Sequence, residues 1–238
     1  MLENISLQKI LFLDIETVPA YPAYEEMPDK WQQLWDKKAK FFIEEGQIPS
    51  EVYERAGIYA EFGKIVCICA GIIAGEGSEK DFRLISFYGE DEKQILQDFC
   101  GLLHKSFNTT EHTLCAHNGK EFDFPYLCRR ILINGMKIPS ILDIAGRKPW
   151  EVQHLDTLQL WKFGDYKHYT SLDLLSSVFD IPSPKEDMDG SQVGSAFYKE
   201  KDYEKIARYC RNDVLAIAQL FLRYQNRELI DPKRVVLV

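Results

Sequence analysis

The stretch LFLDIETV at residues 11–18 decides the fold, because two acids interrupt a hydrophobic run of the kind that forms a buried strand. Side chains two residues apart in a strand point to the same face. Asp14 and Glu16 therefore leave the backbone together, while Leu13 and Ile15 point the other way. Burial of an unpaired charge is costly, so the pair predicts either a bound divalent cation or a strand end whose acids reach solvent.

The composition is that of a globular protein. Of its 238 residues, 45% are hydrophobic and 13% aromatic, so we expect a single domain over residues 1–238. The net charge of −8 argues against a protein that coats nucleic acid, because phosphate binding is driven by Lys and Arg, but it does not exclude a nucleic-acid enzyme. No apolar run approaches the roughly 18 residues of a membrane span. The N-terminal MLENISLQKI is too acidic and polar for a secretory signal, which favours a cytoplasmic location.

The cysteines carry no recognisable metal or disulfide spacing. None of them forms a C-x-x-C pair, and each lies among apolar neighbours. We interpret them as small buried hydrophobic residues rather than as zinc ligands or disulfide partners. They are Cys67, Cys69, Cys100, Cys115, Cys128 and Cys210.

Periodicity predicts an α/β fold. Strands at 11–18, 64–75 and 82–89 are expected to form an antiparallel meander, with a hairpin at 76–81. A helical insertion is expected near 28–60, where WQQLWDKKAKFFIEEG (31–46) has apolar residues at near-helical spacing. Further helices are predicted at 90–107, 122–135, 154–163, 171–180, 191–200 and 202–225, with a short strand at 113–117. This order implies a mixed sheet flanked by helices.

Acids beside apolar sequence recur in two further segments. Asp123 follows the strand at 113–117 in AHNGKEFDFPYL, and Asp213 lies one helical turn after Tyr209 in the final helix. Taken alone, Asp123 is equally well explained as an acid at a helix N-terminus and Asp213 as a surface acid. His154 and Asp156 in HLDT lack a third ligand, and Asp143 and Asp173 are interpreted as helix caps or solvated acids.

Taken together, these segments resemble the DEDD superfamily of 3′-5′ exonucleases. The family pattern is D-x-E, then N-x₂₋₃-(F/Y)-D, then Y-x₃-D, and this chain has DIE at 14–16, NGKEFD at 118–123 and YCRND at 209–213. Position 208 is Arg208, not the histidine of the other subtype, so the tyrosine subtype (DEDDy) is indicated. The surrounding sequence looks most like the stand-alone proteins related to the proofreading exonuclease domain of B-family DNA polymerases.

The resemblance implies a ribonuclease-H-like fold and a metal-dependent 3′-5′ exonuclease that acts on single-stranded DNA ends and releases nucleoside 5′-monophosphates. It also implies that Asp14, Glu16, Asp123 and Asp213 bind two divalent ions, Mg²⁺ or Mn²⁺, and that Tyr209 orients or deprotonates the attacking water. Carboxylates suit these ions because hard cations prefer oxygen ligands.

Substrate contacts are expected from Thr17, Asn118 and Phe122. For Asn118, binding the terminal nucleotide and holding the turn before Asp123 remain equal alternatives; for Phe122, base stacking and core packing are both open. The loop at 181–190 is a candidate cover for substrate. An exoribonuclease of the same superfamily and a non-catalytic binding module are the rival hypotheses. The sequence indicates no repair or replication partner.

Overall fold

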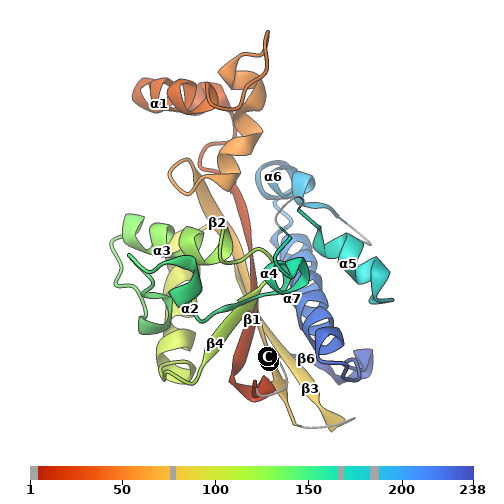
Figure 1. Cartoon of the computed structure of the whole chain (residues 1–238). Coiled ribbons are helices and arrows are strands. Elements are labelled where there is room, and N and C mark those ends of the chain that lie inside the picture. Colours follow the sequence, from red (N-terminus) through yellow and green to blue (C-terminus); the bar gives the residue numbers. More distant parts are fainter. Residues whose placement is uncertain (1–4, 76–78, 166–168, 183–187) are drawn as a thin grey trace.

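The protein is built on a mixed β-sheet with helices on both faces (Figure 1). The computed structural model describes residues 5–75, 79–165, 169–182 and 188–238. In this part of the chain the sheet has six strands, in the order β5-β4-β1-β2-β3-β6. Their bounds are β1 Ile10–Pro19, β2 Gly63–Ala74, β3 Asp81–Tyr88, β4 Thr113–Ala116, β5 Leu155–Asp156 and β6 Val235–Leu237.

Strand directions confirm the predicted α/β sheet of antiparallel followed by parallel strands. The β1-β2 and β2-β3 pairs are antiparallel, whereas β4 lies parallel to β1 and β5 parallel to β4. Residue Asp14 stands opposite Cys69, and Glu16 opposite Cys67. The register of this pair shifts between Glu16 and Thr17, which marks a β-bulge immediately after the two acids.

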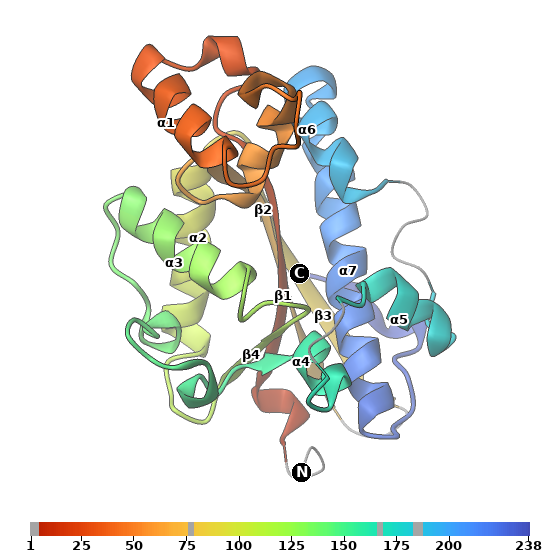
Figure 2. The same ribbon diagram turned by 45° about the horizontal axis from the view of Figure 1, so that its top comes forward.

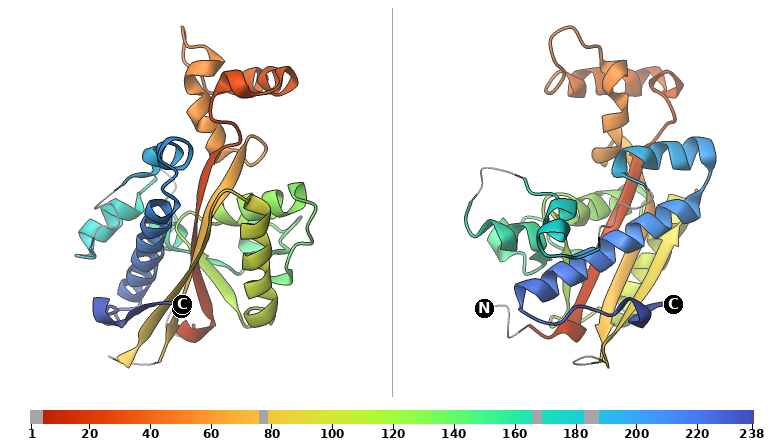
Figure 3. Two further views of the ribbon diagram at one scale, coloured as in Figure 1. Left: turned by 180° about the vertical axis from the view of Figure 1, so that it is seen from behind. Right: turned by 90° about the vertical axis from the view of Figure 1, so that its right-hand side faces the viewer.

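Two cores lie on opposite faces of the sheet. On one face, Leu11, Leu13 and Ile15 of β1 pack with residues of α2 and α3; on the other, Phe12 packs with residues of α7. Views from behind and from the side show α7 crossing the sheet opposite α2 and α3 (Figure 3). The face that carries α7 is also the face to which Asp14 and Glu16 point, because they alternate with Leu13 and Ile15.

Helices α2, α5 and α7 begin at polar caps. The side chains of Asp91, Ser171 and Asp202 accept hydrogen bonds from backbone N–H groups in the first turns of α2, α5 and α7. The α-helices are α1 Asp29–Ala39, α2 Glu92–Ser106, α3 Asp123–Ile133, α4 Thr157–Lys162, α5 Leu172–Val178, α6 Val193–Ser195 and α7 Tyr203–Tyr224. The segment that follows α6 is a π-helix, Ala196–Glu200.

The segment between β1 and β2 has an aromatic core of its own. Helix α1 and the 3₁₀ segment η4 (Pro49–Ile58) pack around Trp35, which is fully buried. The helix predicted over 31–46 ends earlier, at Ala39. After it the chain turns back, with the N–H groups of Phe42 and Ile43 bonded to the carbonyl of Ala39, and the ring of Phe42 lies against Trp35 at 5.8 Å.

One sequence prediction about a short element was wrong, and one short strand was missed. Residues 154–163 were expected to be one helix, but Leu155 and Asp156 form β5 and the helix starts at Thr157, because Asp156 caps it with hydrogen bonds from Leu158 and Gln159. Strand β6 was not predicted at all. It pairs in parallel with β3, where an ion pair of 3.1 Å joins Arg234 to Asp81.

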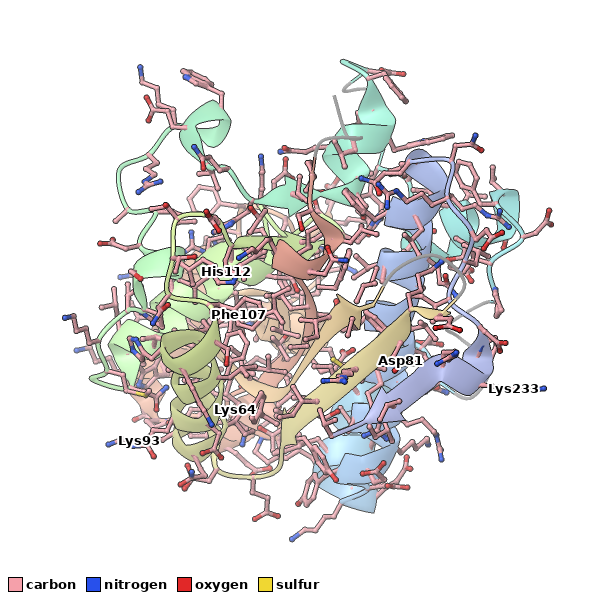
Figure 4. The ribbon with its side chains drawn as sticks, turned by 90° about the horizontal axis from the view of Figure 1, so that it is seen from below. Lys64, Asp81, Lys93, Phe107, His112 and Lys233 are labelled. Atoms are coloured by element: carbon pink, nitrogen blue, oxygen red, sulfur yellow. The ribbon has the colours of Figure 1, made fainter. Side chains whose placement is uncertain are left out.

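A view from below shows Asp81 on β3 with Lys233 on the neighbouring C-terminal segment (Figure 4). This arrangement places the end of the described chain against the sheet edge opposite to β5. The core of the loop expected to cover substrate, 183–187, and the tip of the hairpin, 76–78, lie outside the described residues.

Candidate metal-dependent active site

Strand β1 presents two acids to the interior beside α7. Glu16 is buried and Asp14 is partly exposed. One oxygen of each carboxylate and the Sγ of Cys210 all lie within 4.8 Å of one another. The sequence prediction that the pair shares one face therefore agrees with the register, and the alternative in which both acids reach solvent does not fit the burial of Glu16.

The third acid is presented by a tight turn between β4 and α3. Asn118 has φ +63°, and its carbonyl accepts hydrogen bonds from the N–H groups of Glu121 and Phe122. Gly119 is required in this turn, since a Cβ there would lie 2.4 Å from that of Ala116. Asp123 follows as the first residue of α3 and is only 2% exposed.

Asp156 holds this turn in place. Its carboxylate accepts hydrogen bonds from the backbone N–H groups of Asn118 and Lys120, both at 3.0 Å, in addition to those from Leu158 and Gln159. His154 is also structural, because Ile141 and Leu114 occupy its two ring nitrogens. These contacts agree with the interpretation that His154 and Asp156 are not metal ligands. The positioning role of Asp156 was missed, because it depends on pairing between β4 and β5.

The last two residues come from α7. Tyr209 and Asp213 are one turn apart, and the carboxylate of Asp213 lies close enough to the phenol of Tyr209 to raise its pKa. Figure 2 shows how β1 passes between the start of α3 and the length of α7, so that all three elements converge.

These elements enclose a cleft of about 340 Å³. Six residues singled out in the sequence line it: Asp14, Asn118, Phe122, Asp123, Tyr209 and Asp213. Glu16 lies beneath, in contact with Asp14. Thr17 does not line this cleft; it follows the bulge, and its side chain lies near the hydroxyl of Tyr126. Phe122 lines the cleft and also packs against Tyr126 with ring centroids 5.3 Å apart, a position compatible with base stacking and with core packing.

The rest of the cleft wall was not predicted. It comprises His117, Tyr169, Ser171, Leu172 and Asp173. His117 is fixed by hydrogen bonds to Thr157 and to the carbonyl of Thr170. Asp173, interpreted from the sequence as a cap or solvated acid, lies in the first turn of α5 and faces this cleft. No local signal distinguished it, because only the docking of α5 near α7 brings it there.

The electrostatics of the acids are those of a site built for cations. Burial raises the pKa of Asp14 well above its usual range, and the neighbouring Glu16, Asp123 and Asp213 raise it further. Burial, followed by the charge of Asp213, likewise raises the pKa of Glu16. Burial raises the pKa of Asp123 to about 7, although the backbone N–H groups of Asp123 itself and then of Ile15 oppose the shift. Without positive charge nearby, this environment favours the protonated form of each of these carboxyl groups relative to the same group in water.

The carboxylates fit divalent metal ions. Among the described residues, the buried Oδ1 of Asp123 has no hydrogen-bond partner, which is uncommon for a buried polar atom and is explained by a ligand position. Oxygen donors from Asp14, Glu16, Asp123 and Asp213 are the type that Mg²⁺ and Mn²⁺ prefer. The structure thus supplies an acidic cluster able to bind hard cations.

Comparison with known proteins agrees with this site. Residues 58–233 match the model of a family described as predicted 3′-5′ exonuclease related to the exonuclease domain of PolB. The chain belongs to this family. The matched residues include Asn118, Asp123, Tyr209 and Asp213, whereas β1 with Asp14 and Glu16 precedes them.

The fold is ribonuclease-H-like, as a solved structure shows. The family B DNA polymerase from the hyperthermophilic archaeon Pyrobaculum calidifontis superposes with a TM-score of 0.53 at 16% sequence identity. The match covers 91% of this chain and 24% of that one, so the chain spans about a quarter of the length of the polymerase. Over the described residues, none of the helices is both long and apolar enough to cross a membrane.

Proposed function

We propose that the protein is a metal-dependent 3′-5′ exonuclease of the tyrosine subtype (DEDDy) that hydrolyses single-stranded DNA from its 3′ end to nucleoside 5′-monophosphates. The observation that carries this proposal is the convergence of Asp14, Glu16, Asp123 and Asp213 around one cleft, with a buried carboxylate oxygen that has no partner in the described part of the chain. Membership of the exonuclease family supports the same reaction class.

The four acids would hold two divalent ions, Mg²⁺ or Mn²⁺. When bound, such ions polarise the scissile phosphate and acidify a water molecule. The part of the protein is to fix the ligands before substrate arrives. Asp14 and Glu16 are held by the sheet register, Asp123 by the turn that Asp156 secures, and Asp213 by α7.

Tyr209 would orient the attacking water rather than deprotonate it. Burial and the neighbouring acids, Asp213 first, raise the pKa of this phenol above its ordinary value. A phenol with a raised pKa keeps its proton at neutral pH, so it serves as a hydrogen-bonding group and is a poor base. In the structure it is 9% exposed and lines the cleft, where it can reach a water held beside Asp213.

The cleft wall offers contacts for a terminal nucleotide. Phe122 and Tyr169 line it from α3 and from the segment before α5, and aromatic rings at such positions stack on bases of single strands. Asn118 lines the same wall and also holds the turn. Because the net charge is −8, we infer that bound metal contributes more to phosphate binding than it does in a basic nucleic-acid binder.

We also propose that residues 1–238 form a single domain, with the helical segment near 28–60 as an insertion. Supporting this, β1 and β2 flank the segment and pair along most of their length. The aromatic core of the segment also includes Tyr21 and Phe62, which lie next to the ends of these strands.

The test is digestion of 5′-labelled single-stranded DNA, duplex DNA and RNA of one sequence, each with Mg²⁺, Mn²⁺ or chelator. We expect a ladder that shortens from the 3′ end on single-stranded DNA, with no products in chelator. Early internal fragments, or shortening from the 5′ end, would contradict the polarity. Faster digestion of RNA would favour the exoribonuclease, and absence of products with every metal would favour a binding module.

A further inference from the structure

Three cysteines that are scattered in the sequence meet beneath the acidic cluster. The Sγ atoms of Cys67, Cys69 and Cys210 all lie within 4.8 Å of one another, and all three side chains are fully buried. Cys67 and Cys69 belong to β2 and Cys210 to α7. Their sequence spacing gives no hint of this meeting, since Cys210 lies 141 positions after Cys69.

The thiols turn toward a common point. Residues two apart on a strand are separated by about 6.6 Å along it, yet the Sγ atoms of Cys67 and Cys69 are 3.6 Å apart. Two thiolates on a tetrahedral zinc ion stand about 3.8 Å apart, because each Zn–S bond is about 2.3 Å long. The distance between Cys67 and Cys69 therefore suits two corners of a tetrahedral site, and the Sγ of Cys210 lies within 4.8 Å of both.

A carboxylate lies beside one of the three thiols. The Sγ of Cys210 lies 3.5 Å from the Oδ2 of Asp14, and Cys210 also belongs to the group formed with Asp14 and Glu16. Since Asp14 lines the cleft, it connects the buried thiols to the route by which ions enter. On the other side, the thiol of Cys69 donates to the hydroxyl of Ser86, which also accepts from Arg211. The guanidinium of Arg211 is therefore linked to Cys69 through one hydroxyl group.

We propose that Cys67, Cys69, Cys210 and the Asp14 carboxylate form a site for one thiophilic divalent cation such as Zn²⁺. Thiolates select zinc over magnesium because they are soft ligands. Each thiol that binds releases its proton to solvent. The site competes with the catalytic ions for Asp14, so bound zinc lowers nuclease activity; this consequence rests on the proposed function, whereas the binding itself does not.

The binding test uses Co²⁺ as a coloured probe in metal-free protein kept reduced with a phosphine. We expect one equivalent of Co²⁺ to give a thiolate-to-cobalt charge-transfer band together with the visible bands of tetrahedral cobalt, and one equivalent of Zn²⁺ to abolish them. Cys69→Ala should weaken this binding by at least about 10²-fold, since loss of an outer-shell partner alone costs 10- to 100-fold.

The matched control is Cys115→Ala. Cys115 is also fully buried and belongs to the same core, but it lies outside the cluster. It should leave the cobalt spectrum unchanged. Cys210→Ser, which keeps the volume, provides a second test if Cys69→Ala melts early. Absence of a charge-transfer band in the wild type, or an equal band in Cys69→Ala, would overturn the proposal.

Activity is measured separately. Wild-type protein loaded with one equivalent of Zn²⁺ should lose most of its Mg²⁺-dependent hydrolysis, and Cys69→Ala should resist this loss. An inactive wild type that still shows the cobalt band would refute the nuclease but keep the thiol site. An active wild type without the band would refute the thiol site alone.

Discussion

Two groups of buried acids in this protein have opposite surroundings. Glu92, at the start of α2, accepts hydrogen bonds from the backbone of Ile65, from two nitrogens of Arg130 and from Asn134. Asp156 accepts four backbone N–H groups. By contrast, Asp14 and Asp123 face other acids, and one buried oxygen of Asp123 has no partner among the described residues.

The difference shows how burial alone fails to distinguish a structural acid from a functional one. A carboxylate that accepts hydrogen bonds from the protein stabilises the fold, while one surrounded by like-charged neighbours destabilises it until a cation binds. The hydrogen-bond partners of a buried acid therefore distinguish a structural acid from a functional one.

Asp14→Asn should have the largest effect. The change removes a ligand charge without altering volume, so hydrolysis should fall at least about 10³-fold, as expected when several kcal/mol of metal assistance is lost. The metal-free variant should melt at the same or a higher temperature than wild type, because repulsion among the acids decreases. Rates and melting curves measure both.

The control for this variant is Asp143→Asn, the same chemical change at an exposed acid outside the cleft. It should leave both quantities unchanged. Wild-type turnover by Asp14→Asn, with contaminating nuclease excluded, would refute the two-metal hypothesis.

Tyr209→Phe should lower turnover by about 10² to 10⁴-fold, the range of a general acid or base. The ring and all four carboxylates remain, so binding of Mn²⁺ and of DNA should persist. Asp213→Ala should instead weaken Mn²⁺ binding as well as turnover. Calorimetric titration beside single-turnover kinetics distinguishes the two, and a Phe variant with the wild-type rate would leave Tyr209 as a packing residue only.

Glu92→Gln should lower stability and leave activity unchanged, the reverse of Asp14→Asn. It leaves the guanidinium of Arg130, 11% exposed, without its counter-charge, and breaking a buried pair in this way costs about 3 to 5 kcal/mol. Urea denaturation should show that loss in the free energy of unfolding. Activity per folded molecule should be unchanged. Reduced activity at unaltered stability would contradict the assignment of Glu92 to the structural group of acids.

The smallest effect concerns pH and Mg²⁺. The pKa of Asp123, about 7, lies above the ordinary value of about 3.9. Its protonated form is therefore favoured by the fold, so its contribution to stability is complete below about pH 4 and is lost as the pH rises through about 7. At pH 8 a hundredfold excess of Mg²⁺ over Kd should restore about 2.7 kcal/mol, or roughly 5 to 11 °C in Tm.

At pH 5 the same Mg²⁺ addition should raise Tm less, because protons compete for the carboxylates. Calorimetric scans at both pH values, with Asp14→Asn as the variant with a weakened site, measure this difference. An equal Mg²⁺ effect at pH 5 and pH 8 would show that binding does not involve the acids with raised pKa.

Much of the fold was predictable because its signals are local. Alternation along 11–18 gave β1 and placed Asp14 and Glu16 on one face, and the apolar stripe of 202–225 gave α7 almost to the residue. The end of α1 and strand β5 were not predictable in this way. The end of α1 depends on the packing of Phe42 against Trp35, and β5 depends on the hydrogen bond between Asp156 and the turn before α3. Both are contacts between separate segments.

The sequence by itself determined which residues are acids of the exonuclease pattern, the strand or helix that carries each, and the choice of Tyr209 over a histidine. Only the tertiary structure decided that Thr17 points away from the cleft, that Asp173 and Tyr169 line it, and that Cys67, Cys69 and Cys210 converge beneath Asp14. The physical reason is that periodicity fixes the face a side chain occupies on its own element, whereas its neighbours depend on sheet register and helix docking, which no local pattern encodes.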